Sequence, residues 1–464
     1  MIDDQLFANI EGYSPRNFLE EIEFSQTTEL RAKQIFVGLF RNDLRYVLEA
    51  KNYFHNDGTR WRRDSGDVAL GLAQTVPRRL YRYASETNDV ALASDIGKFA
   101  VFCESRRVIQ AMVALAQSDE QIVSRVSDFD RDPFLLNTVT GTIDLRSGCL
   151  REHRREDMIT KIAGVPYDAA AHCKRWERFM REVFVGKPDV VDFVQRAVGY
   201  SLTGDTREEA MFIAHGRGMN GKSTFLETVK RMSGDYGTTC DSDLLLARGR
   251  HDSSNDIARL AGARFVSCVE VNQGRALDES RVKAMTSSDT MTARFLFQEF
   301  FEFRPELKLW LGTNYRPEIR GTDDGIWRRV RLIPFEGRFQ GVDRDLTLAA
   351  TLTAELPGIL AWAVRGCLAW QDRGLDAPLE VVAATNAYRS ESDLIGEFIT
   401  ERCETRDELE VGAGTLYAGY RAWAESGGEK PVNSTTFGRN MSERGFDRDR
   451  KRTPGRHGIA LRCE

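Results

Sequence analysis

One glycine-rich stretch, residues 211–224 (MFIAHGRGMNGKST), constrains the fold more than any other part of the chain. An apolar run at 211–214 predicts a strand, and Phe225, Leu226 and Val229 recur at helical spacing after the loop. A G-x-x-x-x-G-K-S loop between a strand and a helix is typical of phosphate binding, not of an ordinary glycine-rich turn. The candidate ligand residues for a nucleotide are Gly216, Gly218, Asn220, Gly221, Lys222, Ser223 and Thr224.

The residue types of this loop suit a nucleoside triphosphate. Glycines allow backbone N–H groups to approach phosphates closely, and the following helix presents the positive end of its dipole. Lys222 can reach the outer phosphates and Ser223 can hold Mg²⁺. We therefore predict ATP and Mg²⁺ as cofactors.

Two later apolar runs each end in a polar residue: residues 264–269 lead to Glu270, and residues 307–313 lead to Asn314. In ATPases with such a loop, a strand-end acid binds Mg²⁺ and polarises the attacking water, which a polar residue on the adjacent strand positions. Taken alone, Glu270 could be a solvated carboxylate and Asn314 a turn former. Their order and shared strand-end position favour catalytic roles, with Ser223 and Glu270 as the metal ligands.

Residues 325–335 carry three arginines around a strand-like run. An arginine finger places an always-charged guanidinium beside the γ-phosphate, usually from a neighbouring subunit. Arg328 or Arg329 fits this role. We expect Arg331 to pair with a carboxylate of its own domain instead.

The segment between Glu270 and Asn314 predicts a short helix at 278–285 and a β-hairpin at 290–303. A hairpin at this place could project into a ring channel and touch DNA, with Lys283 and Arg294 as its positive candidates. We expect most of its phenylalanines to be core residues: Phe295, Phe297, Phe300, Phe301 and Phe303.

The C-terminal residues 395–464 predict three helices, a basic stretch and a short hairpin, which is typical of a winged helix. From residue 431 onwards eight Lys or Arg oppose four Asp or Glu, in contrast to the net charge of -5 of the whole chain. The alternative is a winged helix that binds protein. The DNA-binding candidates here are Arg439, Arg444, Arg450, Lys451 and Arg452.

The sequence of the N-terminal part indicates secondary structure but no specific function. We predict a helix at 29–49, a hairpin at 52–61, and further helices at 86–125. Arginines and aromatics interleave at 60–83, which suits single-strand binding, although a solvated charged face over an aromatic core is the commoner arrangement.

Composition narrows the remaining classes. A net charge of -5 excludes a uniformly basic coat, so any DNA contact must be local. No apolar run is long enough to span a bilayer, and the acidic N-terminus has no signal core. The eight cysteines are scattered without a C-x-x-C pair, which predicts reduced thiols and no zinc ribbon. We expect a cytoplasmic protein with no membrane partner.

Several motifs together resemble the phage and plasmid primase–helicases, whose relatives include a satellite-phage replication protein and the poxvirus primase–helicase. The resemblance covers roughly residue 135 to the C-terminus. It rests on NTVTGTID at 137–144, GYSLTGD at 199–205, GRGMNGKST at 216–224, LWLGTN at 309–314, RGTD at 320–323 and IWRR at 326–329.

This resemblance implies a superfamily 3 helicase, whose α/β fold holds an AAA+ P-loop ATPase core that forms hexameric rings. It gives Lys222, Ser223, Glu270 and Asn314 the roles argued above, Arg328 or Arg329 the finger role, and Lys283 a DNA-facing place. The expected domains are an N-terminal region of uncertain fold (1–85), a mainly helical helicase-associated domain (86–205), the ATPase core (206–345), a helical extension (346–394) and a winged-helix-like domain (395–464).

The chain departs from the family pattern at two places. Asn272 stands where family members often have a second acid, which leaves more metal and water work to Glu270 and predicts slow turnover. Ser287-Ser288-Asp289 replaces the common Gly-Gly-Asp. About 130 residues before residue 135 are too few for a primase domain as well, so a separate primase is the expected partner.

We therefore predict an ATP-driven hexameric helicase that translocates on single-stranded DNA and opens forked DNA during replication of a phage, prophage or plasmid in a bacterial host. The first alternative is a DNA-stimulated ATPase that recognises an origin or loads another helicase. The second is a P-loop small-molecule kinase, which would be a monomer.

Overall fold

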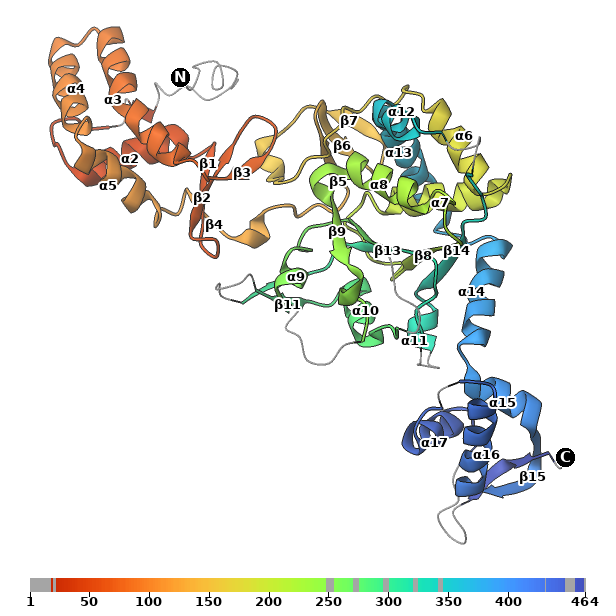
Figure 1. Cartoon of the computed structure of the whole chain (residues 1–464). Helices are drawn as coiled ribbons and strands as arrows, with labels where there is room; N and C mark the ends of the chain where they lie inside the picture. The colour runs from red at the N-terminus through yellow and green to blue at the C-terminus, as the bar shows by residue number, and fades with distance from the viewer. Residues whose placement is uncertain are drawn as a thin grey trace.

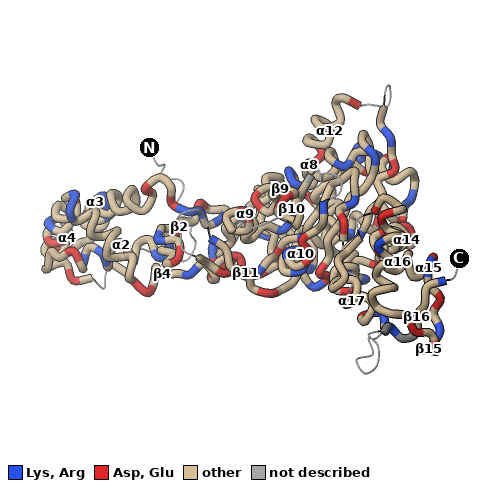
Figure 2. Tube along the Cα trace, turned by 60° about the horizontal axis from the view of Figure 1, so that its bottom comes forward, with Lys and Arg blue, Asp and Glu red and all other residues tan. Residues whose placement is uncertain are grey.

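The computed structural model describes residues 18–19, 22–247, 254–269, 275–294, 300–319, 324–340, 345–429, 431–446 and 455–462. The chain forms an N-terminal lobe, a central body around a parallel sheet, and a C-terminal lobe joined to the body by a helix (Figure 1). Lys, Arg, Asp and Glu are interspersed along the trace in the view of Figure 2, in agreement with the small net charge.

The N-terminal lobe combines helices with a small mixed sheet of order β3-β2-β1-β4. The predicted hairpin is confirmed as β2 and β3, but the predicted helix ends early because residues 44–47 pair with β2 as a strand. One core runs from Leu19 to Ile122, so the regions expected at 1–85 and 86–205 share it. The elements are α2 (Glu29–Phe40), β1 (Leu44–Val47), β2 (Asn52–Asn56), β3 (Trp61–Arg63), α3 (Val68–Glu86), α4 (Val90–Cys103), α5 (Arg106–Ala116) and β4 (Val123–Ser124).

Some of the interleaved arginines and aromatics of this lobe serve packing, the alternative to single-strand binding. Trp61 is buried, Arg60 pairs with Asp235 of the central body, and Arg79 lies over the ring of Phe40. These side chains serve packing within the molecule.

A three-stranded antiparallel sheet and two helices then connect the lobe to the central body. The NTVTGTID motif at 137–144 lies on the first two strands, and the apolar residues of both helices are buried. The elements are β5 (Leu135–Thr138), β6 (Gly141–Asp144), β7 (Cys149–Arg151), α6 (Lys174–Val183) and α7 (Pro188–Tyr200).

The central sheet has five parallel strands in the order β14-β8-β13-β10-β9. Its near-continuous apolar strands are typical of a parallel sheet covered on both faces. Alternate residues enter two cores: Phe212 and Trp310 pack with α6, α7 and α13, whereas Ile213 and Leu311 pack on the opposite face with α10. The elements are β8 (Met211–His215), α8 (Lys222–Ser233), β9 (Gly237–Asp241), α9 (Ser254–Ala258), β10 (Phe265–Val269), α10 (Glu279–Thr286), β13 (Lys308–Thr313), α11 (Asp324–Trp327) and β14 (Val330–Pro334).

The predicted hairpin between Glu270 and Asn314 is confirmed as the antiparallel pair β11 (Met291–Ala293) and β12 (Phe301–Phe303). Residues 295–299 between the two strands, which include Phe295 and Phe297, lie outside the described residues. The expectation of core phenylalanines is wrong for the others, since Phe300 is 60% exposed and Phe301 and Phe303 are only half-buried. A two-stranded ribbon has too little sheet to bury them.

The helical extension and the C-terminal lobe complete the chain. The three helices predicted for the lobe are confirmed, but β16 pairs with β15, which precedes the second helix, so the expected hairpin after the third helix is not the pairing observed. The elements are α12 (Leu348–Ala354), α13 (Leu356–Arg373), α14 (Leu379–Glu391), α15 (Leu394–Arg402), β15 (Cys403–Gly412), α16 (Ala413–Ser426), α17 (Ser434–Glu443) and β16 (Gly455–Leu461).

Two further observations concern the cysteines and the helices. Cys240 and Cys268, opposite each other on β9 and β10, form a disulfide, so the expectation of reduced thiols is wrong for this pair. Among the described helices none is by itself long and apolar enough to cross a membrane; α12 and α13 meet that test only as a pair bent by 70°.

Candidate nucleotide-binding site

The glycine-rich loop lies between β8 and α8, as predicted. Gly221 caps α8 in the left-handed region at φ 85°, and Met219 also has a positive φ of 62°. A Cβ on Gly216 would lie 2.2 Å from Asn220 Nδ2 and 2.3 Å from the carbonyl oxygen of Phe335. The loop therefore needs Gly216 for close packing, whereas the space around Gly218 is open.

The Lys222 ammonium is held by three acceptors inside this loop. It donates to the carbonyl of Gly216 at 2.7 Å, to Asn220 Oδ1 at 2.9 Å and to Asn314 Oδ1 at 2.9 Å. Burial lowers the pKa of Lys222 to about 8. The structure thus joins Lys222 and Asn314, which the sequence separates by 92 residues.

Asn220 has a second contact that the motif alone does not reveal. Its Nδ2 donates to the carbonyl of Phe335 at 3.1 Å, directly after β14. Asn220 therefore links the loop, the lysine and the strand beside β8. Since Phe335 contributes only a carbonyl, no side-chain signal could have pointed to it.

A cavity of about 230 Å³ opens in front of the loop. It is bounded by the loop and the first turn of α8 on one side and by the end of β13 on the other. The Ser223 side chain is exposed at this cavity. A neighbouring cavity of about 470 Å³ shares Ser223, Thr224 and Leu226 and extends along α8 to Thr353 of α12 and Leu356 of α13. No sequence motif points to this second cavity.

The predicted acid Glu270 lies outside the described residues, and so does Asn272. The strand before Glu270 is described. It is β10, which ends at Val269, and Val269 pairs with Gly312 of β13, two residues before Asn314. Because the carboxyl ends of parallel strands share one edge of a sheet, the cavity lies at the edge where β8, β13 and β10 end.

Arg328 and Arg329 lie at the opposite edge. The backbone N–H of Met211, the first residue of β8, donates to the Arg329 carbonyl at 2.8 Å. Five residues of β8 separate this point from the loop, roughly 13 Å along the strand. Figure 1 shows α11, which precedes these arginines, and α8 on opposite sides of the sheet.

The two arginines differ in exposure. The Arg329 side chain is 7% exposed and pairs with Glu209 at 2.7 Å, while the Arg328 side chain is 62% exposed and contacts the same carboxylate at 2.7 Å. Arg331 donates to the carbonyls of Arg328 and Val330, and the carboxylate of Glu208 acts on it only through space among the described residues.

The DNA-binding candidates are scattered over three elements. Lys283 is half-buried on α10, and the Arg294 guanidinium lies 4.7 Å from the centre of the exposed Phe300 ring at the hairpin. Arg439 is 71% exposed on α17, 3.8 Å from Glu443. Arg450, Lys451 and Arg452 lie outside the described residues.

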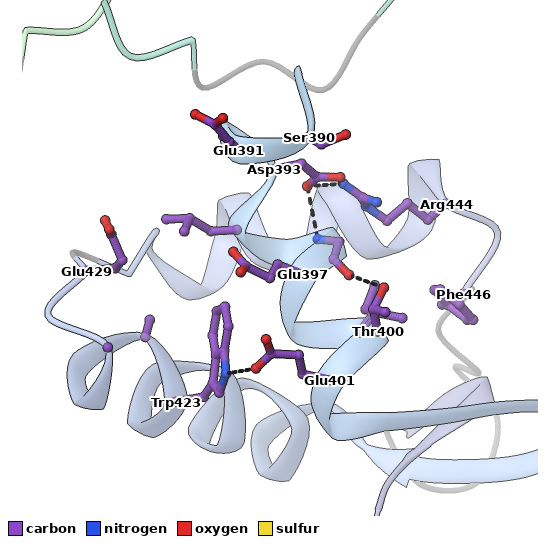
Figure 3. A pocket seen from close by; sticks show the side chains of 15 residues that line it. Ser390, Glu391, Asp393, Glu397, Thr400, Glu401, Trp423, Glu429, Arg444 and Phe446 are labelled. Carbon is purple, nitrogen blue, oxygen red and sulfur yellow. Dashed lines mark hydrogen bonds and ion pairs between the residues drawn. The ribbon is translucent and has the colours of Figure 1, made fainter. Parts of the chain in front are cut away.

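Arg444 has a different environment. Its guanidinium pairs with Asp393 and lines a pocket of the C-terminal lobe (Figure 3). The other charged side chains of that pocket are all carboxylates: Glu391, Asp393, Glu397, Glu401 and Glu429. These carboxylates favour a structural role for Arg444 over contact with phosphate.

Comparison with known proteins supports the motif-based resemblance. The family described as "D5 N terminal like" matches residues 33–185, and the one described as "Poxvirus D5 protein-like" matches residues 390–453. Both matches support the resemblance to the primase–helicases of phage and viral type. A family of unknown function matches residues 214–329 of this chain, which include the glycine-rich loop and Arg328.

The similar curated proteins come from large DNA viruses. "Putative helicase L207/L206" of Acanthamoeba polyphaga mimivirus is 27% identical over 327 residues, covering 64% of this chain and 34% of the viral protein. "Putative helicase 022R" of Frog virus 3 is 24% identical over 383 residues, covering 64% and 39%. The chain therefore spans little more than a third of the length of these relatives.

The fold also has a solved neighbour. The apo structure of the NrS-1 C-terminal region superposes with a TM-score of 0.50 at 9% identity, covering 94% of this chain and all of that one. At that identity the likeness concerns the fold alone.

Proposed function

We propose that this primase–helicase family member is an ATP-driven DNA helicase with a superfamily 3, AAA+ type core. The observation that carries the proposal is the junction of Lys222 and Asn314 at the cavity in front of the loop. A lysine that bridges the loop and the end of the neighbouring strand suits a group that binds the γ-phosphate beside a water-positioning amide.

The residues at the cavity fit ATP with Mg²⁺. The cavity is bounded by the backbone of the loop, the Lys222 ammonium and the exposed Ser223 hydroxyl, and oxygen is the donor that Mg²⁺ prefers. When bound, the ion would neutralise charge on the phosphates, with Ser223 and Glu270 as its holders. Lys222 would leave the Asn220 and Asn314 oxygens for the phosphate, which frees Asn314 to orient the attacking water.

The arginine finger of this proposal is Arg328, supplied by a neighbouring subunit. Its place at the far edge of the sheet keeps it from the loop of its own chain. Its 62% exposure leaves it accessible to a partner, in contrast to the buried Arg329. This arrangement supports a homo-oligomeric ring, for which we propose a hexamer.

DNA contact is assigned to the hairpin and the C-terminal lobe. Arg294 and the exposed Phe300 combine a cation with an aromatic face, which suits single-stranded nucleic acid. The order α15, β15, α16, α17, β16 supports a winged helix, whose exposed Arg439 and basic residues 450–452 would contact phosphates. A separate primase remains the proposed source of primers.

The first prediction concerns ATP turnover. Lys222→Ala is expected to reduce ATP hydrolysis by at least about a thousandfold, because it removes the charge aimed at the phosphates. Glu270→Gln is expected to bind ATP but not to hydrolyse it. Both are measured by phosphate release and by equilibrium binding of labelled ATP.

The control is Lys230→Ala, which removes another lysine of α8 whose ammonium pairs with Glu227 at 2.6 Å. It should turn over ATP like the wild type. Near wild-type turnover by Lys222→Ala or Glu270→Gln would show that the catalytic assignment is wrong.

A further inference from the structure

Three side chains from two segments meet at the start of β14. One oxygen of Glu209, Oε2, is 2.7 Å from Arg328 Nη2 and 2.7 Å from Arg329 Nη2. Glu209 precedes β8, and both arginines precede β14, the strand paired with β8. A single carboxylate therefore holds two guanidinium groups.

The two guanidinium groups are held very differently. Arg329 also donates from Nε to Thr286 Oγ1 at 3.2 Å and from Nη1 to the carbonyl of Gly325 at 2.6 Å, and it is buried. These contacts fix Arg329 to its own subunit. Arg328 points to the surface, where an ion pair is weak and exchangeable.

The backbone of Glu209 is unusual. Its φ of 47° lies in the left-handed region, which a residue with a Cβ seldom adopts. Its N–H donates to the carbonyl of Thr206 at 2.9 Å, so a tight turn delivers the side chain to the arginines. Strained positions of this kind cluster at functional sites.

We propose that Glu209 is a positioning residue that holds the Arg328 finger until a neighbouring subunit offers a γ-phosphate; the inference rests on the proposed function. Arg328 then exchanges one anion for another. Arg329 stays on Glu209, so the departure of Arg328 leaves no half-buried carboxylate unpaired. Arg328 is thus the finger, and Arg329 is the permanent ion-pair partner of Glu209.

The test is the rate of ATP hydrolysis in the absence of DNA. Glu209→Gln removes the competing charge, so basal kcat is expected to rise roughly 1.5- to 5-fold, the range that an exposed ion pair contributes. The rise should vanish when Glu209→Gln is combined with Arg328→Ala, because there is no finger left to release. Glu208→Gln is the matched control: it changes the adjacent acid, whose Oε1 accepts from Trp370 Nε1 at 2.8 Å, and basal kcat should not change.

Glu209→Asp covers the case in which Glu209→Gln does not fold around the buried Arg329. It keeps a negative charge but is one methylene shorter, and a smaller rise in kcat is expected. An unchanged or lowered basal kcat in the folded variants, or a rise that persists with Arg328→Ala, would overturn the proposal by placing the effect in Arg329 packing.

The outcomes separate this inference from the function on which it rests. If the wild type hydrolyses ATP and Arg328→Ala does not slow it, the finger and its holder are both rejected while the ATPase stands. If the wild type shows no turnover, the proposed function fails and takes the inference with it.

Discussion

At the residue scale, small side chains and the amide of Asn220 hold Lys222 in place within the loop. Asn220 accepts from Lys222 and donates to the carbonyl of Phe335, so the position of the lysine depends on β14 as well as on the loop. Gly216 makes this possible, because any Cβ there would occupy the space of Asn220 Nδ2 and of the Phe335 carbonyl.

Gly216→Ala is therefore expected to displace Asn220 and destabilise the fold by about 1–3 kcal/mol, the usual range for overpacking. Nucleotide affinity should fall with it, because Lys222 loses a partner. Thermal unfolding and ATP-analogue titration measure the two effects. In Gly218→Ala the new methyl group meets open space, so its stability should stay within about 0.5 kcal/mol of the wild type; equal effects of both substitutions would contradict the packing argument.

At the element scale, the local patterns predicted the parallel strands, the loop and most helices, because each has a strong periodicity or a motif of its own. They failed where a distant partner decides the structure. Residues 44–47 became a strand because β2 and β4 pair with them, and β16 pairs with β15 and not with a nearby segment. The site followed the same rule: the motif predicted Lys222 and Asn314, whereas Glu209 and the Phe335 carbonyl could be found only through three-dimensional contacts.

Lys308 at the start of β13 is a second case of a charge that the pattern did not single out. It is 1% exposed and donates to the carbonyls of Thr203, Glu306 and Asp205 beside the ring of Tyr200. It thereby ties the segment before β8 to the central sheet. Burial lowers the pKa of Lys308 to about 7.

The linked prediction concerns stability against pH. Because the folded-state pKa lies below the unfolded value of about 10.4, the unfolded chain binds more protons between these values, and the Lys308 contribution to stability rises with pH from about 7 upwards. Between pH 7 and 9 this contribution increases by about 1–3 kcal/mol. The unfolding free energy of the wild type minus that of Lys308→Met should therefore increase by that amount from pH 7 to pH 9. A difference independent of pH would show that Lys308 keeps an ordinary pKa.

At the scale of the whole molecule, three parts are arranged around one sheet (Figure 1). The buried helices α7 and α13 share a core with the central sheet, so the segment before β8 and the extension after β14 belong to the same body. The C-terminal lobe has its own core and follows α14. Arg328 and the cavity lie at opposite edges of this sheet, so a finger role for Arg328 needs a neighbouring subunit to complete the proposed site.

The most direct test of the account is strand displacement on a forked DNA duplex. The account predicts that the wild type releases the displaced strand only with ATP and Mg²⁺, and that Lys222→Ala releases none while Lys230→Ala behaves like the wild type. ATP hydrolysis that is stimulated by single-stranded DNA but displaces no strand would contradict the helicase claim and favour an ATPase that recognises an origin or loads another helicase.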